Sequence, residues 1–198
     1  MSAETPAYRV ALKQGPIEIR EYPAMVAAEV VVGGDRNSSV RNGFRLLAGY
    51  IFGGNDGGRK IAMTAPVVQR PGAGTRITMT APVMQSQTGG DWTVQFLMPG
   101  SWTLDTLPKP NNSHVHLRPV PRSTVAALRF SGLAREPDIR RQTQRLNAFL
   151  GEHDLQPAGA PALARYDPPW QPWFMRRNEI LIELEPESAA APATQRTA

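Results

Sequence analysis

The chain has 198 residues, of which 41% are hydrophobic, and carries a formal net charge of +5. This length predicts one domain with a real core and leaves two small domains as an alternative. Because cysteine is absent, disulfides, thiolate metal sites and a cysteine nucleophile are excluded. No apolar run approaches the roughly 20 residues of a spanning helix. The first residues lack the basic segment followed by an apolar segment that is typical of a signal peptide. We therefore expect a cytoplasmic location, with a periplasmic one open if a signal peptide was removed.

The positive charge is spread along the chain and is supplied mostly by arginine. A nucleic-acid-binding domain is expected to concentrate such residues in a stripe with interleaved aromatic side chains. No such stripe is visible, and scattered arginine is typical of a solvated surface. The sequence therefore predicts no nucleic-acid partner, and it leaves the oligomeric state open.

The first half begins with a loose segment, and we expect a flexible arm over residues 1–12. Residues 16–32 then form a β-branched run that predicts one long or bent strand. Ser38 or Ser39 is a candidate N-cap for a helix. Apolar residues follow at helical spacing and are stopped by a glycine-rich segment at 53–58. The helix face consists of Val40, Phe44, Leu47 and Ile51.

Two nearly identical segments come next, KIAMTAPVVQ at 60–69 and ITMTAPVMQ at 77–85. Both alternate with period 2, which predicts the two strands of a hairpin around the turn RPGAGT. Pro66 and Pro82 lack an amide donor, so each is expected at a sheet edge or bulge. A third strand is expected over 92–100, with Val94, Phe96 and Met98 on one face.

The second half repeats this order of elements. Residues 114–133 predict a strand, a proline bend and a strand, and residues 136–153 a helix that starts near Pro137. Two strands are expected around 162–184, and the low-complexity residues 186–198 predict a disordered tail. We therefore expect an α+β fold of two pseudo-repeated β-α-β-β halves, with the antiparallel sheet curled into a distorted barrel flanked by two helices.

Catalytic patterns are missing from the sequence. His114 and His116 share one strand face, but no third metal ligand is placed near them. There is no G-x-S-x-G elbow, the carboxylates are dispersed, and the glycine-rich segment at 53–58 does not precede a helix. We therefore expect a protein that is not an enzyme and holds no metal through its own ligands.

Methionine is frequent on the central segments, at Met63, Met79, Met84 and Met98. Its thioether adapts to irregular partners and contacts aromatic systems favourably. These side chains either fill an ordinary core or face a flat ligand, and the sequence leaves both alternatives open.

Taken together, IEIREYPA, KIAMTAPV, FLMPGSW and YDPPWQPWFMRRNEILIEL resemble the SOUL heme-binding protein family, and the doubled M-T-A-P-V resembles its bacterial members. The resemblance implies one SOUL-like domain over residues 13–185. It implies that the two β-α-β-β halves form a distorted barrel. It also implies a fold similar to that of the effector domains of drug-sensing regulators.

The same resemblance implies non-covalent binding of heme, or of another porphyrin or tetrapyrrole, by a carrier, buffer or sensor. Around the macrocycle it places Val40, Phe44, Leu47, Met63 and Met79. At the rim, for the propionates, it places Lys60, Arg176 and Arg177. Two other functions stay open: a general binder or sensor of bulky hydrophobic or aromatic ligands, and a protein-interaction module without a small ligand.

Overall fold

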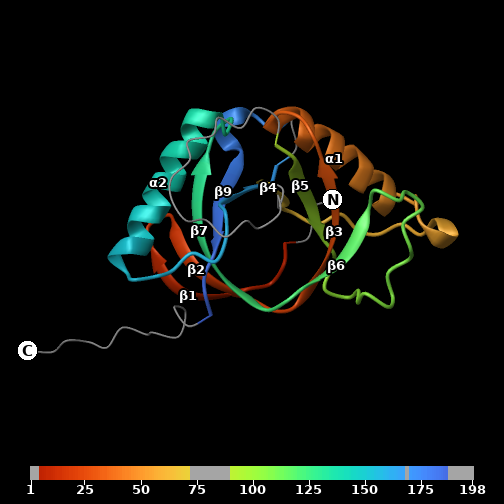
Figure 1. Cartoon of the computed structure of the whole chain (residues 1–198), viewed down its shortest axis with the longest axis horizontal. Helices are drawn as coiled ribbons and strands as arrows, with labels where there is room; N and C mark the ends of the chain where they lie inside the picture. The colour runs from red at the N-terminus through yellow and green to blue at the C-terminus, as the bar shows by residue number, and fades with distance from the viewer. Residues whose placement is uncertain (1–4, 72–89, 168–169, 187–198) are drawn as a thin grey trace, which may run out of the picture. The chain divides into compact units, whose positions relative to one another are not determined.

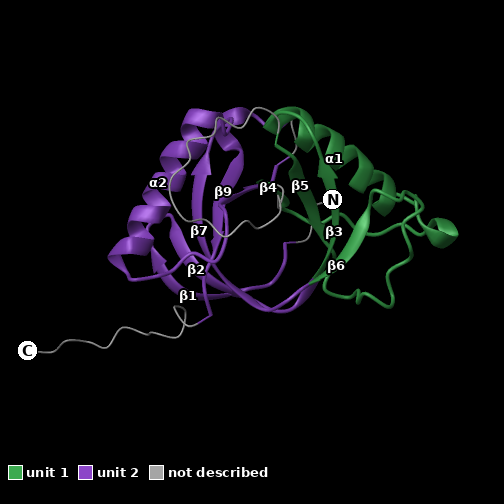
Figure 2. Cartoon of the chain, in the orientation of Figure 1, with its two compact units in different colours: residues 1–4, 26–119 green, residues 5–25, 120–198 purple. Residues whose placement is uncertain are grey.

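The structure is a computed structural model that describes residues 5–71, 90–167 and 170–186. Its contacts divide the chain into two compact units, which Figure 2 shows in green and purple. Unit 1 contains the described residues of Val26–Pro119, and unit 2 those of Thr5–Met25 and Val120–Ala198. The second of the two similar segments, with Met79, Pro82 and Met84, lies outside the described residues.

Unit 1 is an antiparallel sheet with one long helix (Figure 1). Its elements in chain order are β3 (Met25–Val32), α1 (Arg36–Ile51), the 3₁₀ turn η1 (Asp56–Gly58), β4 (Val67–Pro71), β5 (Trp92–Leu97) and β6 (His116–Val120). The strands lie in the order β4-β5-β3-β6, and β5 runs antiparallel to both β3 and β4. Helix α1 packs against β5.

Unit 2 is built in the same way, with two further strands from the start of the chain. Its elements are β1 (Arg9–Gln14), β2 (Ile17–Tyr22), β7 (Ser123–Ser131), α2 (Glu136–Glu152), β8 (Ala162–Arg165), the 3₁₀ turn η2 (Trp173–Met175) and β9 (Arg177–Glu183). The strand order is β1-β2-β7-β9-β8, every pair is antiparallel, and α2 covers β7 and β9.

The two units repeat one topology. In unit 1 the succession β3-α1-β4-β5 arranges its strands as β4-β5-β3, and in unit 2 the succession β7-α2-β8-β9 arranges them as β8-β9-β7. A fourth strand borders the first strand of each repeat: β6 beside β3, and β2 beside β7. The predicted α+β fold of two β-α-β-β halves is confirmed. The distorted barrel concerns the arrangement of the two units and stays a prediction.

Each unit has its own apolar core. In unit 1, Leu47, Tyr50 and Ile51 of α1 pack with residues of β3 and β5 that include Val94 and Phe96. In unit 2, one face of the sheet contributes Ile19, Leu128 and Ile180, and α2 contributes residues that include Leu146 and Phe149. Burial of these side chains supplies most of the free energy that offsets chain ordering.

Three local predictions differ from the structure. The N-cap of α1 is Asp35, whose carboxylate accepts from the backbone N–H groups of Asn37 and Ser38, so the helix begins earlier than predicted. Residues 9–12 belong to β1 and pair with β2, although the sequence predicted a flexible arm. The first similar segment is strand only after Pro66, because β4 begins at Val67. The period-2 alternation over 60–66 therefore does not mark a strand, because most of this segment is not paired with another strand.

The contact between α1 and β5 depends on a glycine. A Cβ on Gly43 would lie 2.7 Å from both Cβ and Cγ2 of Val94, which is fully buried in β5. Glycine is otherwise unfavourable inside a helix by about 1 kcal/mol. Gly43 thus lets the helix approach the sheet more closely than any other residue would permit.

We predict that Gly43→Ala lowers the melting temperature, because Val94 is held by the strand and overpacking costs about 1–3 kcal/mol. The matched control is Gly49→Ala in the same helix, where an added Cβ meets nothing within 4 Å. This control should raise stability by roughly 0.5–1 kcal/mol through helix propensity. Thermal unfolding monitored by circular dichroism measures both, and equal effects of the two substitutions would contradict the packing argument.

Candidate ligand-binding site

Helix α1 is fixed at both ends by polar side chains. Its first turn is held by Gln69 of β4, whose Nε2 donates to the carbonyl of Arg36 at 2.7 Å and to Oγ of Ser39 at 2.8 Å. At its last turn, the side-chain amide of Asn55 donates to the carbonyl of Tyr50 at 2.8 Å. The Tyr50 hydroxyl in turn donates to the carbonyl of Pro108 at 3.0 Å. The helix is therefore a rigid support for the side chains along it.

One edge of α1 is apolar and open to solvent. Val40, Phe44, Ala48 and Phe52 recur every four residues, so they form a continuous stripe along the helix. Val40 and Ala48 are half-buried, whereas Phe44 is 38% and Phe52 62% exposed. The Phe44 ring meets Phe96 edge-on, with centroids 5.3 Å apart. Phe44 is thus anchored on one side and free on the other.

The apolar edge is flanked by positive charge. Arg41 and Arg45 follow Val40 and Phe44 directly and are both exposed, and α1 contains no aspartate or glutamate. Neither guanidinium makes a hydrogen bond or ion pair with the residues that the structure describes, although the charge of Arg41 contributes to lowering the pKa of Asp35. The edge can therefore contact a flat apolar group and leave cations available for an attached carboxylate.

The structure distributes the predicted site residues between the units. Unit 1 brings together Val40, Phe44 and Leu47 on neighbouring positions of α1, although Leu47 is fully buried in the core. Lys60 is exposed just beyond the helix, and Met63 is half-buried against the unit 1 core.

The remaining predicted residues lie elsewhere. Arg176 and Arg177 belong to unit 2, and Met79 lies outside the described residues. The sequence prediction missed Phe52, Arg41 and Arg45. Continuing the four-residue spacing past Phe44, and noting the arginine after each apolar position, is the signal that could have found them.

A cavity of about 560 Å³ lies beside another part of α1. It is lined by Arg45, Leu46, Gly49, Tyr50, Gly54, Asn111, Asn112 and Ser113. The volume falls in the range of small-molecule sites. The lining, however, is mostly polar side chains and glycine backbone. It suits a small polar molecule better than a large apolar macrocycle.

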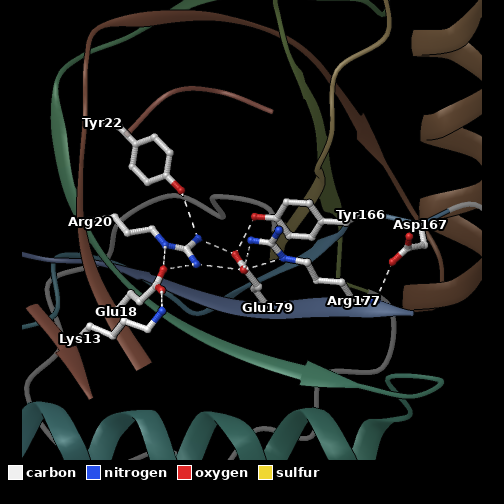
Figure 3. A network of polar contacts seen from close by, with 8 residues as sticks. All are labelled: Lys13, Glu18, Arg20, Tyr22, Tyr166, Asp167, Arg177 and Glu179. Carbon is white, nitrogen blue, oxygen red and sulfur yellow. Dashed lines mark hydrogen bonds and ion pairs between the residues drawn. The ribbon is translucent and has the colours of Figure 1, made fainter. Parts of the chain in front are cut away.

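Unit 2 contains a buried ionic network around Glu179 (Figure 3). Glu179 is fully buried and Arg20 is 2% exposed. The two Glu179 carboxylate oxygens accept from Arg20 at 2.7 and 3.0 Å. They also accept from Arg177 at 2.7 and 3.1 Å and from the Tyr166 hydroxyl at 2.6 Å. Arg20 further donates to Glu18. The Arg177 guanidinium, predicted at a propionate rim, is thus already paired with Glu179.

The network sits on the face of the sheet away from α2 (Figure 3). Alternate residues of β9 contribute Ile180 and Ile182 to the apolar core under α2, whereas Glu179 faces the other side. Ala127 and Ala164 are buried on β7 and β8, where Ala164 pairs with Glu179. Their small side chains leave room for the long ones of Arg20 and Arg177.

The network also sets the protonation of its members. Burial alone acts to raise the pKa of Glu179, but the hydrogen bonds and charges of Arg20, Tyr166 and Arg177 outweigh it and lower the pKa below 4.5. Burial beside the Glu179 charge raises the pKa of the Tyr166 hydroxyl. Glu179 is therefore ionised and Tyr166 neutral near pH 7, which is the arrangement that the hydrogen bonds need.

We predict that this network makes the protein sensitive to acid. Because the pKa of Glu179 is lower in the folded chain than in the unfolded chain, its contribution is fully present above 4.5 and is lost as the pH falls through the folded pKa. Glu179→Gln should destabilise unit 2 by about 3–5 kcal/mol at pH 7. The buried Arg20 would keep only Glu18 as a counter-charge, and the half-buried Arg177 would lose its carboxylate partner. Chemical unfolding at pH 7 and at pH values below 4.5 measures both effects.

The matched control is Glu21→Gln, which removes a carboxylate from the same region of unit 2. Glu21 pairs with Arg9 at the exposed edge, and exposed ion pairs contribute about 0–1 kcal/mol. A Glu179→Gln variant that keeps the wild-type stability and the wild-type loss of stability in acid would contradict the assigned role of the network.

The histidines do not form a metal site with the residues described. No group of three or more His, Cys, Asp or Glu side chains within residues 5–71, 90–167 and 170–186 is placed to hold a metal ion. His116 begins β6, and His114 lies in the preceding turn, where its N–H donates to Oδ1 of Asn112. Neither helix of the described chain is long and apolar enough to cross a membrane.

Comparison with known proteins identifies the class to which this fold and chain belong. The family model described as SOUL heme-binding protein matches residues 3–183. The chain therefore belongs to the SOUL family.

Two relatives are annotated proteins of mammals. The chain is 30% identical to Heme-binding protein 2 of Homo sapiens over 158 residues, which cover 76% of this chain and 71% of the relative. It is 28% identical to Heme-binding protein 2 of Mus musculus over 178 residues, which cover 85% and 82% of the two chains.

The fold also occurs outside the family. The crystal structure of the EcmrR C-terminal domain superposes with a TM-score of 0.61 and covers 90% of this chain and 98% of that domain. Only 12% of the aligned residues are identical. This likeness shows that the α+β architecture is shared, and it shows the fold alone.

Proposed function

We propose that this protein binds heme or a related tetrapyrrole non-covalently, and that the macrocycle lies against the apolar edge of α1. Val40, Phe44 and Phe52 contact the ring, Met63 adjoins it, and Leu47 supports Phe44 from the core. Arg41, Arg45 and Lys60 are available for its carboxylates. Family membership supports the ligand class, and the exposed edge of α1 supports the place.

The observation that carries the proposal is the difference between the two helices. In α2, which is described throughout, the large apolar residues Ile139, Leu146, Phe149 and Leu150 are all buried. In the topologically equivalent α1, Phe44 is 38% exposed and Phe52 follows at 62%. A fold that can bury every large apolar side chain of one helix leaves these exposed in the other, as expected of a ligand surface.

The side chains along α1 suit the faces and the propionates of a tetrapyrrole, but they offer its iron no histidine. Aromatic rings suit the faces of the macrocycle, and guanidinium groups suit its propionates. However, neither α1 nor residues 60–71 contain a histidine. Heme held mainly by its porphyrin exchanges readily, since a strong axial bond is what fixes the iron and its chemistry. We therefore propose a carrier, buffer or sensor and not an enzyme.

A second function is favoured by the same edge. Rings and cations without an iron ligand do not by themselves select heme, so a general binder of bulky aromatic anions uses the same surface. Titration with iron-free protoporphyrin distinguishes the two. Equal affinity for both porphyrins supports selection by shape and charge, and much tighter binding of heme supports iron ligation.

We predict that Phe44→Asp weakens heme binding at least tenfold. The added carboxylate would place a charge against the apolar ring, which is unfavourable. It would also compete with the carboxylates of the ligand for Arg41 and Arg45. Because Phe44 is already partly exposed, the variant should fold. The matched control is Leu104→Asp, which changes a 43% exposed residue of unit 1 outside the helix. Soret titration measures both, and equal weakening by the two substitutions would place the site elsewhere.

We also predict that replacing both His114 and His116 by alanine leaves heme affinity within a few-fold. Neither residue belongs to α1 or to the segment that follows it. No iron–imidazole bond is therefore lost, and the Soret position should stay unchanged. A double variant with a shifted or missing Soret band would show that one of these imidazoles ligates the iron.

A further inference from the structure

An exposed aromatic cluster lies in unit 2, on the loop between β8 and β9. Within residues 170–175, here called the aromatic loop, Trp170 is 82%, Trp173 58%, Phe174 61% and Met175 58% exposed. Isolated exposed apolar residues are normal, but four large ones within six positions form a patch that requires an explanation. The tetrapyrrole site proposed above is in unit 1 and does not use them.

The aromatic loop is ordered by its own hydrogen bonds. Residues 173–175 form the 3₁₀ turn η2, in which the N–H of Met175 donates to the carbonyl of Pro172 at 3.0 Å. Nε of Arg176 donates to the carbonyl of Gln171 at 2.8 Å and joins the two ends of the turn. The rings of Trp173 and Phe174 meet edge-on, 5.8 Å apart. The apolar side chains are thus presented outward from a preformed turn.

The base of the loop is tied to the Glu179 network. Backbone N–H of Tyr166 donates to the carbonyl of Arg177 at 3.2 Å, and the N–H of Arg177 donates to the Asp167 carboxylate. Tyr166 and Arg177 both bond Glu179 (Figure 3). The buried carboxylate therefore holds the two strands that carry the loop. A mobile loop would lose more conformational entropy when its side chains become ordered on a partner.

We propose that the aromatic loop docks this protein on an anionic lipid surface by inserting its aromatic side chains at the membrane–water interface. Tryptophan is enriched at that interface, where an amphipathic ring is favoured. Arg165 and Arg176 border the loop, Arg177 is paired with Glu179, and the whole chain carries a net charge of +5. Positive charge near a membrane is attracted to anionic headgroups.

A lipid surface fits the loop better than a second protein does. The cluster is a single short turn whose side chains are each more than half exposed. A stable protein interface needs about 800 Å² from each partner and a closely matched surface. Lipid is deformable and needs no matched pocket, so a few aromatic side chains combined with positive charge are sufficient for reversible binding.

Co-sedimentation of the full chain with lipid vesicles, in the absence of heme, tests the proposal. We expect binding to phosphatidylcholine vesicles that contain phosphatidylglycerol, weaker binding to phosphatidylcholine alone, and weakening by salt. A Trp173→Ser and Phe174→Ser double variant should lose at least about tenfold in partitioning, because two large apolar side chains no longer leave water. The matched control replaces Val10 and Leu12 of β1, each 41% exposed, by serine and should bind as the wild type does.

Tryptophan quenching by brominated lipid provides a second measurement on variants that keep the apolar volume. Trp173→Phe should reduce the quenched fraction of fluorescence, whereas Trp102→Phe, in unit 1, should not. The proposal is overturned if the wild type does not sediment with anionic vesicles, or if the double serine variant sediments equally well. Concentration-dependent self-association that needs Trp173 and Phe174, without any vesicle binding, would instead assign the loop to a second copy of the chain.

Discussion

The ionised Glu179 side chain is the constraint on which unit 2 depends. Its carboxylate joins Arg20 of β2 to Arg177 of β9, with β7 lying between these strands. Removing the Glu179 charge leaves the buried Arg20 with Glu18 and takes away the carboxylate that Arg177 bonds, so the members of the network depend on one another. The same contacts fix Tyr166 and Arg177 at the base of the aromatic loop. Internal stability and the presentation of an external surface therefore have one physical origin.

The fold was largely predictable because it depends on local pattern. The period of 3.6 in both helices, the alternation in β5 and the bend between β6 and β7 are all properties of short segments. Predictions failed where a neighbouring group decided the outcome. Asp35 displaced the serines as N-cap because its carboxylate reaches two backbone N–H groups. Residues 60–66 alternate like a strand, but β4 begins only after the proline.

The candidate site was less predictable, for a physical reason. The sequence shows that Phe44 lies on an apolar helix face, but it does not show how far that face turns away from the sheet. In the structure Gly43 packs onto Val94, and Phe44 at the next position is 38% exposed. Arg177 is the opposite case. From the sequence, an arginine near the end of the chain looks free to bind a ligand, but in the structure it is paired with the buried Glu179, two residues further on.

The repeat explains how one topology supports different surfaces. In both units a helix that follows the first strand of the repeat lies on the sheet. Helix α2 buries its large apolar residues, whereas α1 buries Leu47, Tyr50 and Ile51 but leaves Phe44 38% exposed. The polar side chains differ too. Unit 2 contains the buried ionic network, whereas unit 1 carries Arg41 and Arg45 on a helix without acidic residues. In a repeated fold the core positions are constrained by packing. Exposed positions can differ between the repeats, because surface substitutions change stability little. The binding edge proposed for α1 and the aromatic loop between β8 and β9 can therefore coexist without altering either core.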